Sequence, residues 1–528
     1  MGSEAVVSGT GVNPSQSISG VGDGGLTKRT LRGFKWTYLS FFLQSVLQLG
    51  VLFVLARVLS PRDFGLVGIT LIFTSLTERV GQVGIGPALV QRAEITEAHL
   101  RTGSSLSLLI GLLFFTVLWF AAPFAAEFFA EPELTALLHF VSISFVIESL
   151  GMVPQSVLQR ELRFKAVMLA ENLSYFLGQG VVAYTLAIYG FGPWALATGI
   201  VATRLVKTVT LLSFAPHWPT LRIRRQESKE LLNTGLGFSL TRILNYCALQ
   251  GDNFVVGRLV GATGLGLYTR AYQLMTIPAN YFGRVLDRVL FPAMAQRQQE
   301  RARLTGAFLL ATEIVALVGM PMSVFMYGAA PEIVLVLFGK QWEAVIPVFQ
   351  ILSIGVFCRT SYKNCDTLAR ALGKVYRHAS RQLLYTALVV GGALIGGRWG
   401  LEGVAWAVLF AVTVNYVVMS LFSLVLLELP WQRLVAAHGP AVWVYLLLAA
   451  VLFPFLSLLR EAGLPPLAIV AAAGLAAAAV CSLALVVAPP HFRITFAPWV
   501  LKHFPLNKFG RLGHVSAYLL TRIAARNN

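Results

Sequence analysis

Charge is scarce in this sequence, and that scarcity excludes most soluble folds. Charged residues make up 12% of the 528 residues, about half of the share that soluble domains carry. Hydrophobic residues account for 56%, and the mean hydropathy is +0.70. We therefore expect an all-α polytopic membrane protein rather than a soluble domain.

The apolar residues form windows that are long enough to cross a membrane. A bilayer core requires roughly 20 apolar residues for each helical crossing. By this measure the chain holds about fourteen transmembrane helices. The predicted spans are residues 34–56, 65–90, 103–126, 135–157, 166–189, 193–214, 233–256, 264–291, 305–329, 344–369, 378–397, 402–427, 440–458 and 466–488. The spans 65–90 and 344–369 are the weakest, because both carry charges.

Cysteine is also scarce, and the residues of common catalytic sites form no motif. The cysteines lie in apolar segments without a CxxC pair, which favours buried thiols over a disulfide or a metal site. They are Cys247, Cys358, Cys365 and Cys481. Histidines show no metal-ligand spacing, and no GxxxxGK(S/T) loop is present to bind ATP. We expect neither an enzyme nor a bound cofactor or metal.

Acidic residues are outnumbered, with 24 Asp and Glu against 42 Lys and Arg, so the net charge is +18. If the ends of the predicted spans alternate between the two sides, most basic residues fall on one side. On the other side, the basic residues of the loops are only Arg57, Arg62, Arg258, Lys340, Arg398 and Arg460. The positive-inside rule then places both termini in the cytoplasm. Attraction of anionic lipid or cargo is a second use of the basic loops, and no nucleic-acid partner is expected.

The sequence repeats itself at an interval of about 200 residues. Residues 50–66 read GVLFVLARVLSPRDFGL, and residues 251–267 read GDNFVVGRLVGATGLGL, with glycine, phenylalanine, valine and arginine at matching places. Further pairs follow in the same order: PALVQR and PAMAQR, LQREL and LARAL, YGFGPWALA and WGLEGVAWA. Each unit holds six predicted helices, so both copies cross the membrane in the same sense. Transporters built from such parallel repeats bind cargo between the halves, although duplication also produces scaffolds.

The repeat defines the expected domain organisation. Two lobes of six helices each are followed by two additional helices and flanked by tails. The expected parts are a disordered cytoplasmic tail at 1–30, an N-terminal lobe at 31–215, a C-terminal lobe at 216–430, two helices at 431–490 and a basic cytoplasmic tail at 491–528.

Charged side chains inside the predicted spans are the candidate functional residues. Each costs about 2.5–3.5 kcal/mol at the bilayer centre on insertion scales and normally faces a wet cavity or a partner. The basic set predicts a cationic cavity, and the planar guanidinium suits phosphate oxygens. The candidate ligands of such an anionic cargo are Arg79, Arg242, Arg284, Arg288, Arg359 and Lys363. The candidate gating or coupling residues are Glu78, Asp252, Asn253, Asp287 and Asp366.

These charges have a second interpretation. Arginines can pair with Glu78, Asp287 and Asp366 as struts between helices, but basic groups outnumber acidic ones. Glu148 and Glu171 in the spans 135–157 and 166–189 are either counter-ion or proton sites or polar residues packed between helices. The second alternative is the more common one in membrane proteins.

Asp252 and Asn253 replace the apolar pair Val51 and Leu52 of the first repeat. The surrounding glycine, phenylalanine and arginine frame is otherwise kept. We expect the pair at the periplasmic mouth of the cavity, as part of an outer gate or in contact with Arg258 or with the facing lobe.

Three stretches carry a resemblance to a known family. They read FKWTYLSFFLQSVLQLGVLFVLARVLSPRDFGLVGI, VGQVGIGPALVQR and LQGDNFVVGRLVGATGLGLYTRAYQL. The chain resembles the Wzx-type polysaccharide flippases of the MOP superfamily, in the lipopolysaccharide and exopolysaccharide branch, over residues 30–490. The two motifs that follow the first and seventh predicted helices are fairly specific to this branch.

The resemblance implies a MATE-like fold in the bacterial inner membrane. It implies that undecaprenyl-diphosphate-linked oligosaccharide repeat units are flipped to the periplasmic leaflet by alternating access, with the sugar diphosphate in a cationic cavity. It also implies coupling to a proton or sodium gradient and a polysaccharide polymerase and export machinery as partners. The alternatives are an ion-coupled drug antiporter of the same superfold, a membrane glycosyltransferase and a structural scaffold.

Overall fold

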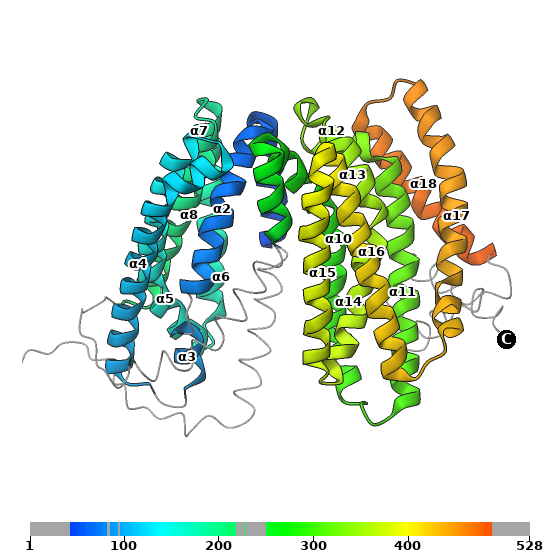
Figure 1. The fold of residues 1–528 in the computed structure, drawn as a ribbon, viewed down its shortest axis with the longest axis horizontal. Coiled ribbons are helices and arrows are strands. Elements are labelled where there is room, and N and C mark those ends of the chain that lie inside the picture. Colours follow the sequence, from blue (N-terminus) through cyan, green and yellow to red (C-terminus); the bar gives the residue numbers. More distant parts are fainter. Residues whose placement is uncertain (1–42, 82–84, 93–94, 218–227, 229–249, 488–528) are drawn as a thin grey trace, which may run out of the picture.

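The protein is represented by a computed structural model that describes residues 43–81, 85–92, 95–217, 228 and 250–487. These residues form helices and connecting loops, without strands, gathered in two bundles (Figure 1). The predicted tails, most of the span 233–256 and Arg242 lie outside the described residues.

The N-terminal bundle begins with the helix Leu43–Val58. It continues with α2 (Pro61–Gly81), α3 (Ile85–Gln91), α4 (Glu97–Phe129), α5 (Glu133–Arg160), α6 (Phe164–Tyr175), the π-helix η1 (Phe176–Ala183), α7 (Tyr184–Ile188) and α8 (Pro193–Phe214). The span predicted at 193–214 coincides with α8, and the described part of the span predicted at 65–90 lies in α2 and α3, with residues 82–84 outside the described residues.

The C-terminal bundle begins with the helical residues 250–259. It continues with α10 (Gly261–Ala295), α11 (Arg301–Gly328), α12 (Ala330–Leu337), η2 (Lys340–Trp342), α13 (Val345–Ile354), α14 (Val356–Ala371), α15 (Val375–Gly396), η3 (Gly397–Trp399) and α16 (Gly400–Leu427). Two further helices, α17 (Trp431–Glu461) and α18 (Pro466–Val487), pack on its outer side (Figure 1).

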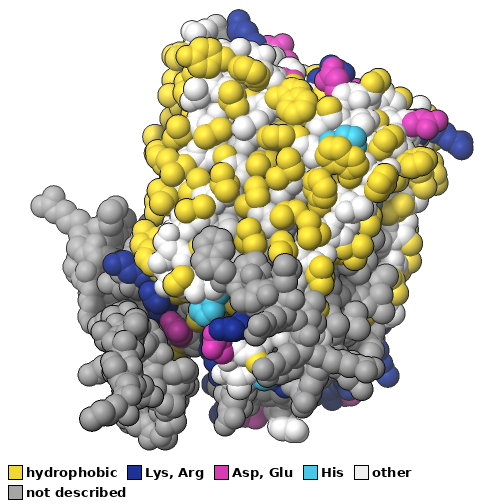
Figure 2. All heavy atoms as spheres, turned by 90° about the vertical axis from the view of Figure 1, so that its left-hand side faces the viewer, with side chains coloured by type: hydrophobic (Ala, Val, Ile, Leu, Met, Phe, Trp, Pro, Cys, Tyr) yellow, Lys and Arg dark blue, Asp and Glu magenta, His cyan; other side chains and the backbone are white. Residues whose placement is uncertain are grey.

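The described helices confirm an all-α polytopic membrane protein. Seven segments of the described residues are long and apolar enough to cross a membrane, with Arg377–Leu427, which contains most of α15 and all of α16, counted once. The helices α13 and α14, bent by 44°, form an eighth span if they are counted as one. The total of fourteen remains a prediction. The outer face of the N-terminal bundle is covered with hydrophobic side chains between charged margins (Figure 2). On α4, Phe120 and Phe124 are 70% and 74% exposed, as expected of side chains that contact lipid.

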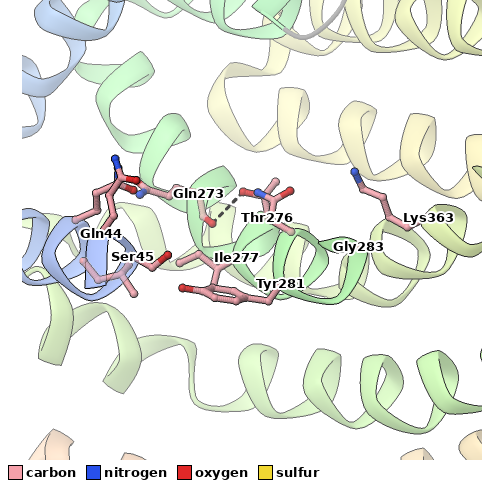
Figure 3. A pocket seen from close by; sticks show the side chains of 11 residues that line it. Gln44, Ser45, Gln273, Thr276, Ile277, Tyr281, Gly283 and Lys363 are labelled. Carbon is pink, nitrogen blue, oxygen red and sulfur yellow. Dashed lines mark hydrogen bonds between the residues drawn. The ribbon is translucent and has the colours of Figure 1, made fainter. Parts of the chain in front are cut away.

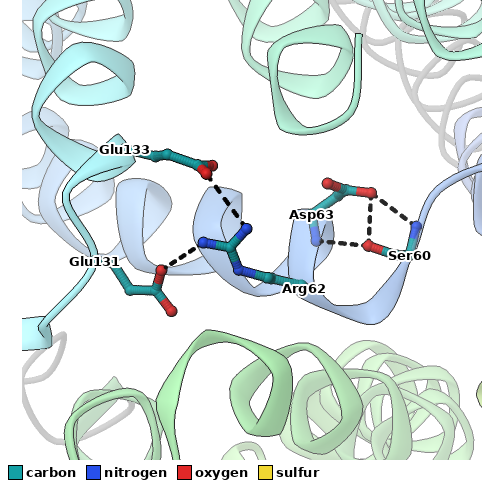
Figure 4. Close-up of polar contacts among 5 residues, drawn as sticks. All are labelled: Ser60, Arg62, Asp63, Glu131 and Glu133. Carbon is teal, nitrogen blue, oxygen red and sulfur yellow. Dashed lines mark hydrogen bonds and ion pairs between the residues drawn. The ribbon is translucent and has the colours of Figure 1, made fainter. Parts of the chain in front are cut away.

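The start of α2 explains the SPRD letters of the first repeated motif (Figure 4). The backbone N–H of Ser60 donates to Asp63 Oδ2 over 2.8 Å, and the N–H of Asp63 donates to Ser60 Oγ over 3.3 Å. This reciprocal pair is a capping box, which satisfies amide groups that a helix start leaves unpaired. Pro61 occupies the first helical position, where its missing N–H costs nothing. The motif therefore fixes where α2 begins.

Arg62 ties this helix start to the loop between α4 and α5 (Figure 4). Its guanidinium binds Glu131 over 2.9 Å and Glu133 over 3.3 Å. The hydrogen bond with Glu131 raises the pKa of Arg62 above its usual value. Because Arg62 and its two carboxylate partners are partly exposed, these ion pairs fix the position of the helix start but add little to the free energy of unfolding.

An ion pair near the end of α17 connects the additional helices to the C-terminal bundle. Arg460 Nε binds Glu332 Oε1 over 2.7 Å, and its terminal nitrogen donates to the Gly328 carbonyl over 2.7 Å. Glu332 is 5% exposed, so its charge depends on this partner. The pair anchors α17 to α12, which leads into the segment that contacts the other bundle.

Candidate functional site

The two bundles meet where α2 crosses α10. A Cβ atom placed on Gly65 would lie 1.7 Å from the carbonyl oxygen of Ala262, and one placed on Gly266 would lie 1.9 Å from that of Pro61. Only glycine permits backbones to approach so closely. Gly65 and Gly266 occupy matching places in the repeated motifs, so each motif packs on the other. We call this contact the crossing.

Hydrogen bonds reinforce the crossing from the C-terminal bundle. Trp342 Nε1 donates to the carbonyl of Ala56 over 2.7 Å. Gln341 Nε2 donates to the carbonyls of Ala56 over 2.5 Å and of Leu59 over 3.1 Å. These carbonyls lie at the C-terminal end of the helix Leu43–Val58, where the helix itself provides no donors. We call these three hydrogen bonds the latch.

Aromatic contacts between the bundles follow the repeat. Phe53 lies against Phe338 with ring centroids 6.4 Å apart, and Phe254 lies against Phe129 with centroids 5.3 Å apart. Phe53 and Phe254 are equivalent in the two repeats. Each half therefore inserts the same aromatic residue into the facing half.

The repeated arginines of the two motifs also reach across. Arg57 donates to the carbonyl of Val336 over 2.8 Å. Arg258 lies over the ring of Phe128, 5.2 Å from its centroid. One arginine therefore makes a hydrogen bond and the other a cation–π contact, so this end of the interface is pseudo-symmetric in position but not in chemistry.

A cavity of about 370 Å³ lies between the bundles (Figure 3). This volume falls within the range of roughly 300–1,000 Å³ that is typical of small-molecule sites. The lining consists of Gln44, Ser45, Gln48 and Leu49 from the N-terminal bundle and Gln273, Thr276, Ile277, Asn280, Tyr281, Gly283 and Lys363 from the C-terminal bundle. Among these residues Lys363 carries the only charge, and most of the others are amides or hydroxyls.

Most of the other predicted ligands, and two of the predicted gating residues, lie on α10 and α2. Arg284, Asp287 and Arg288 follow Gly283 on α10, and Glu78 and Arg79 lie in the last turn of α2. Arg242 lies outside the described residues. Of the six predicted ligands, Lys363 is the one that the described cavity lining includes. The roles of all six as ligands of the cargo remain predictions.

Arg359 lies inside the C-terminal bundle rather than in the cavity lining. It is 9% exposed and donates to the hydroxyl of Tyr385 over 2.7 Å. Its guanidinium also lies 5.8 Å from the ring of Tyr272. A buried arginine needs such partners because an uncompensated charge is costly, so Arg359 joins α14 to α10 and α15.

Asp252 belongs to the same buried group. It is 3% exposed and accepts a hydrogen bond from the hydroxyl of Tyr268 over 2.9 Å. The expected contact with Arg258 or with the facing lobe is therefore replaced by a partner in its own bundle. The sequence could not reveal this contact. Tyr268 and Asp252 both lie on apolar helices, and hydrophobic periodicity does not specify how two such helices are rotated against each other.

Asn253 and Asp366 also have partners within the C-terminal bundle. Asn253 Nδ2 donates to Gln250 Oε1 over 2.5 Å. Asp366 binds Arg370 over 3.1 Å and His378 over 2.8 Å. The last contact joins α14 to α15, but through a histidine, and the arginine partner of Asp366 lies on its own helix rather than among the predicted ligands.

Arg270 was missing from the predicted site residues. It donates to Gln273 Oε1 over 2.5 Å, and its guanidinium lies 4.5 Å from the ring centroid of Phe64 in the other bundle. Phe64 in turn packs on Trp342 of the latch, with ring centroids 5.3 Å apart. Arg270 thus links the cavity wall to the crossing. Its spacing of three from Gln273 on one helical face was the available signal.

Comparison with known families agrees with this arrangement. Residues 54–347 match the family model described as polysaccharide biosynthesis protein. This match covers more than half of the chain. The chain belongs to the polysaccharide biosynthesis protein family. Its membership confirms the family that the repeated motifs indicated.

Two relatives in this family match most of the chain. The teichuronic acid biosynthesis protein TuaB of Bacillus subtilis is 28% identical over 401 residues, covering 74% of this chain and 82% of TuaB. The lipopolysaccharide biosynthesis protein WzxC of Escherichia coli is 25% identical over 407 residues, covering 76% of this chain and 82% of WzxC.

Solved structures confirm the MATE-like fold. The lipid II flippase MurJ, in an inward closed conformation, aligns with a TM-score of 0.62 at 13% identity, over 86% of this chain and all of MurJ. An inward-facing multidrug resistance MATE transporter of the MOP superfamily aligns with a TM-score of 0.56 at 17% identity, over 73% of this chain and 94% of that protein. This member of the family thus shares the two-lobed fold of the superfamily.

Proposed function

We propose that the protein flips undecaprenyl-diphosphate-linked oligosaccharide repeat units across the bacterial inner membrane, for exopolysaccharide or lipopolysaccharide biosynthesis. The observation that carries this proposal is a polar cavity between two bundles that touch through their repeated motifs. The family and the names of its relatives support it. A polymerase and export machinery would receive the product.

The charge distribution supports an orientation. Both termini face the cytoplasm, and Arg57, Arg258 and Lys340 lie on the periplasmic side. The crossing and the latch then form the outer gate, which is closed in this conformation. Cargo reaches the cavity from the cytoplasmic leaflet.

Transport follows from separating the two bundles at the outer gate. The sugar diphosphate enters the cavity while its polyprenyl tail stays in lipid. Rocking of the bundles then breaks the crossing and opens the cavity toward the periplasm. No bond of the cargo is made or cleaved, so the protein acts as a carrier and not as an enzyme. Arg79, Arg242, Arg284, Arg288 and Lys363 bind the diphosphate.

Ion coupling is assigned to the buried polar group of the C-terminal bundle. Asp252 accepts from Tyr268 and lies near Arg359, so a change in its charge alters how the helices of this bundle pack. A proton or sodium gradient can therefore bias the two conformations. The substitution Asp252→Asn should leave cargo binding intact and remove the dependence of flipping on the gradient.

The test is a strain without this gene. We expect its lipid-linked repeat units to accumulate on the cytoplasmic side, where a glycosidase added outside spheroplasts does not reach them. Reintroducing the gene should restore their cleavage from outside. If the repeat units are equally accessible with and without the gene, the proposal is refuted.

A further inference from the structure

The cavity wall holds amide side chains for which the described part of the chain provides no hydrogen-bond partner. Gln44 and Gln48 lie one turn apart on the helix Leu43–Val58, and Asn280 faces them from α10. Within the described part of the chain these three amides make no hydrogen bond. Polar groups inside a membrane protein normally have partners. The described residues therefore leave these amide groups available to water or to a cargo.

Gln273 completes the set, and its orientation is fixed. Because Arg270 donates to its Oε1 atom, the NH₂ group of Gln273 is left for the cavity. We call Gln44, Gln48, Gln273 and Asn280 the amide belt. Two of its members come from each bundle, so a ligand held by the belt contacts both halves of the transporter.

The chemistry of the belt suits a carbohydrate better than a phosphate. An amide offers both donors and an acceptor, and a sugar hydroxyl also donates and accepts. A phosphate oxygen at neutral pH only accepts, so it is best bound by lysine or arginine. Lys363 is the one cation of the described lining, and its side chain packs beside Gly283.

The amides and the basic residues follow one another along α10. Gln273 lies nearest the crossing, and Gly283 is ten residues further, about 15 Å along the helix axis. Arg284 and Arg288 follow beyond Gly283. The cationic end of the pathway therefore lies away from the closed gate, on the side where a lipid diphosphate enters.

We propose that the amide belt binds the hydroxyl and acetamido groups of the sugars next to the diphosphate, and so selects a glycosylated lipid over the bare lipid diphosphate. The inference rests on the proposed function. The diphosphate lies at the Lys363 end, and the first sugars extend from it toward Gln273. A flippase with this arrangement does not transport the lipid diphosphate that carries no sugar.

The test compares two probes on the full chain in lipid nanodiscs. The probes are farnesyl diphosphate and farnesyl diphosphate linked to N-acetylglucosamine, with affinities measured from tryptophan fluorescence. We expect the wild-type protein to bind the glycosylated probe more tightly. Gln48→Ala and Asn280→Ala should each reduce that preference by about 2- to 10-fold, as expected for one lost hydrogen bond, while the affinity for farnesyl diphosphate is unchanged.

The matched control is Gln350→Ala, an amide on α13 outside the cavity, which should leave both affinities unchanged.

Equal binding of the two probes by the wild-type protein overturns the selection inference and leaves flipping intact. An equal loss for both probes in the variants also overturns it, because the belt would then bind the diphosphate. Binding of neither probe refutes the proposed function itself. The two variants lie in different bundles, so a folding defect in one leaves the other as the test.

Discussion

Replacing Gly266 with alanine should open the outer gate. The added Cβ would lie 1.9 Å from the carbonyl oxygen of Pro61, whereas an ordinary contact requires at least 3.4 Å. The atoms nearest to this Cβ all belong to the backbone of Pro61 and Gly65, so no side-chain rotation can relieve the clash. The helices α2 and α10 must separate, and the latch must lengthen with them.

The magnitude follows from the contacts that this separation breaks. The three hydrogen bonds of the latch, and the one from Arg57 to Val336, are 2.5 to 3.1 Å long. Each contributes about 0.5–1.5 kcal/mol, so together they hold the gate closed by about 2–6 kcal/mol. Since 1.4 kcal/mol corresponds to a factor of ten, the gate-open population should rise by at least about 10-fold.

The assay measures access to the cavity from outside the cell. A reporter variant Thr276→Cys, in a background without the native cysteines, is treated with a membrane-impermeant maleimide. Labelling should be slow when Gly266 is present and at least about 10-fold faster with Gly266→Ala. The control is Gly306→Ala on α11, where an added Cβ meets no atom within 4 Å. Equal labelling of all three proteins would refute the role of the crossing as a gate.

Three further outcomes are expected. Arg79→Ala and Arg284→Ala should each reduce polymer output at equal expression, because a guanidinium that binds phosphate is lost; unchanged output would remove the diphosphate assignment. Trp342→Phe keeps an aromatic ring but loses one latch hydrogen bond, and should speed external labelling of the same reporter by about 2- to 10-fold; a labelling rate equal to wild type would show that the bond is not part of the gate. Ser60→Ala should lower the free energy of unfolding by about 0.5–2 kcal/mol through loss of the capping box, measured by thermal unfolding in detergent; a stability equal to wild type would contradict the capping role.

Much of the fold followed from local pattern. The apolar window 193–214 matches α8, and the repeated motifs mark the helix starts that meet at the crossing. These features depend on sequence neighbours and on the length of a bilayer. The break between α13 and α14 at Gly355 was not apparent, because both halves are helical and lie within one predicted span.

The site was less predictable, since it depends on how distant helices are rotated against each other. The Trp342 side chain binds the carbonyl of Ala56 across 286 residues, and no local pattern marks such a partner. Arg359 was selected for its charge, but the structure pairs it with tyrosines inside one bundle. Conversely, the amides that line the cavity were not among the predicted site residues, because an uncharged polar residue in an apolar window is common.

The reciprocity at the crossing has a consequence for the origin of the chain. Gly65 touches the backbone of Ala262, and Gly266 touches that of Pro61, so residue i meets j and j meets i. Such a self-complementary surface is what two identical subunits form about a two-fold axis. A single six-helix ancestor carrying this motif would already have had the surface required to form a homodimer. In a single chain the two halves need not remain identical, and Asp252 and Asn253, where the first repeat has Val51 and Leu52, are one such difference.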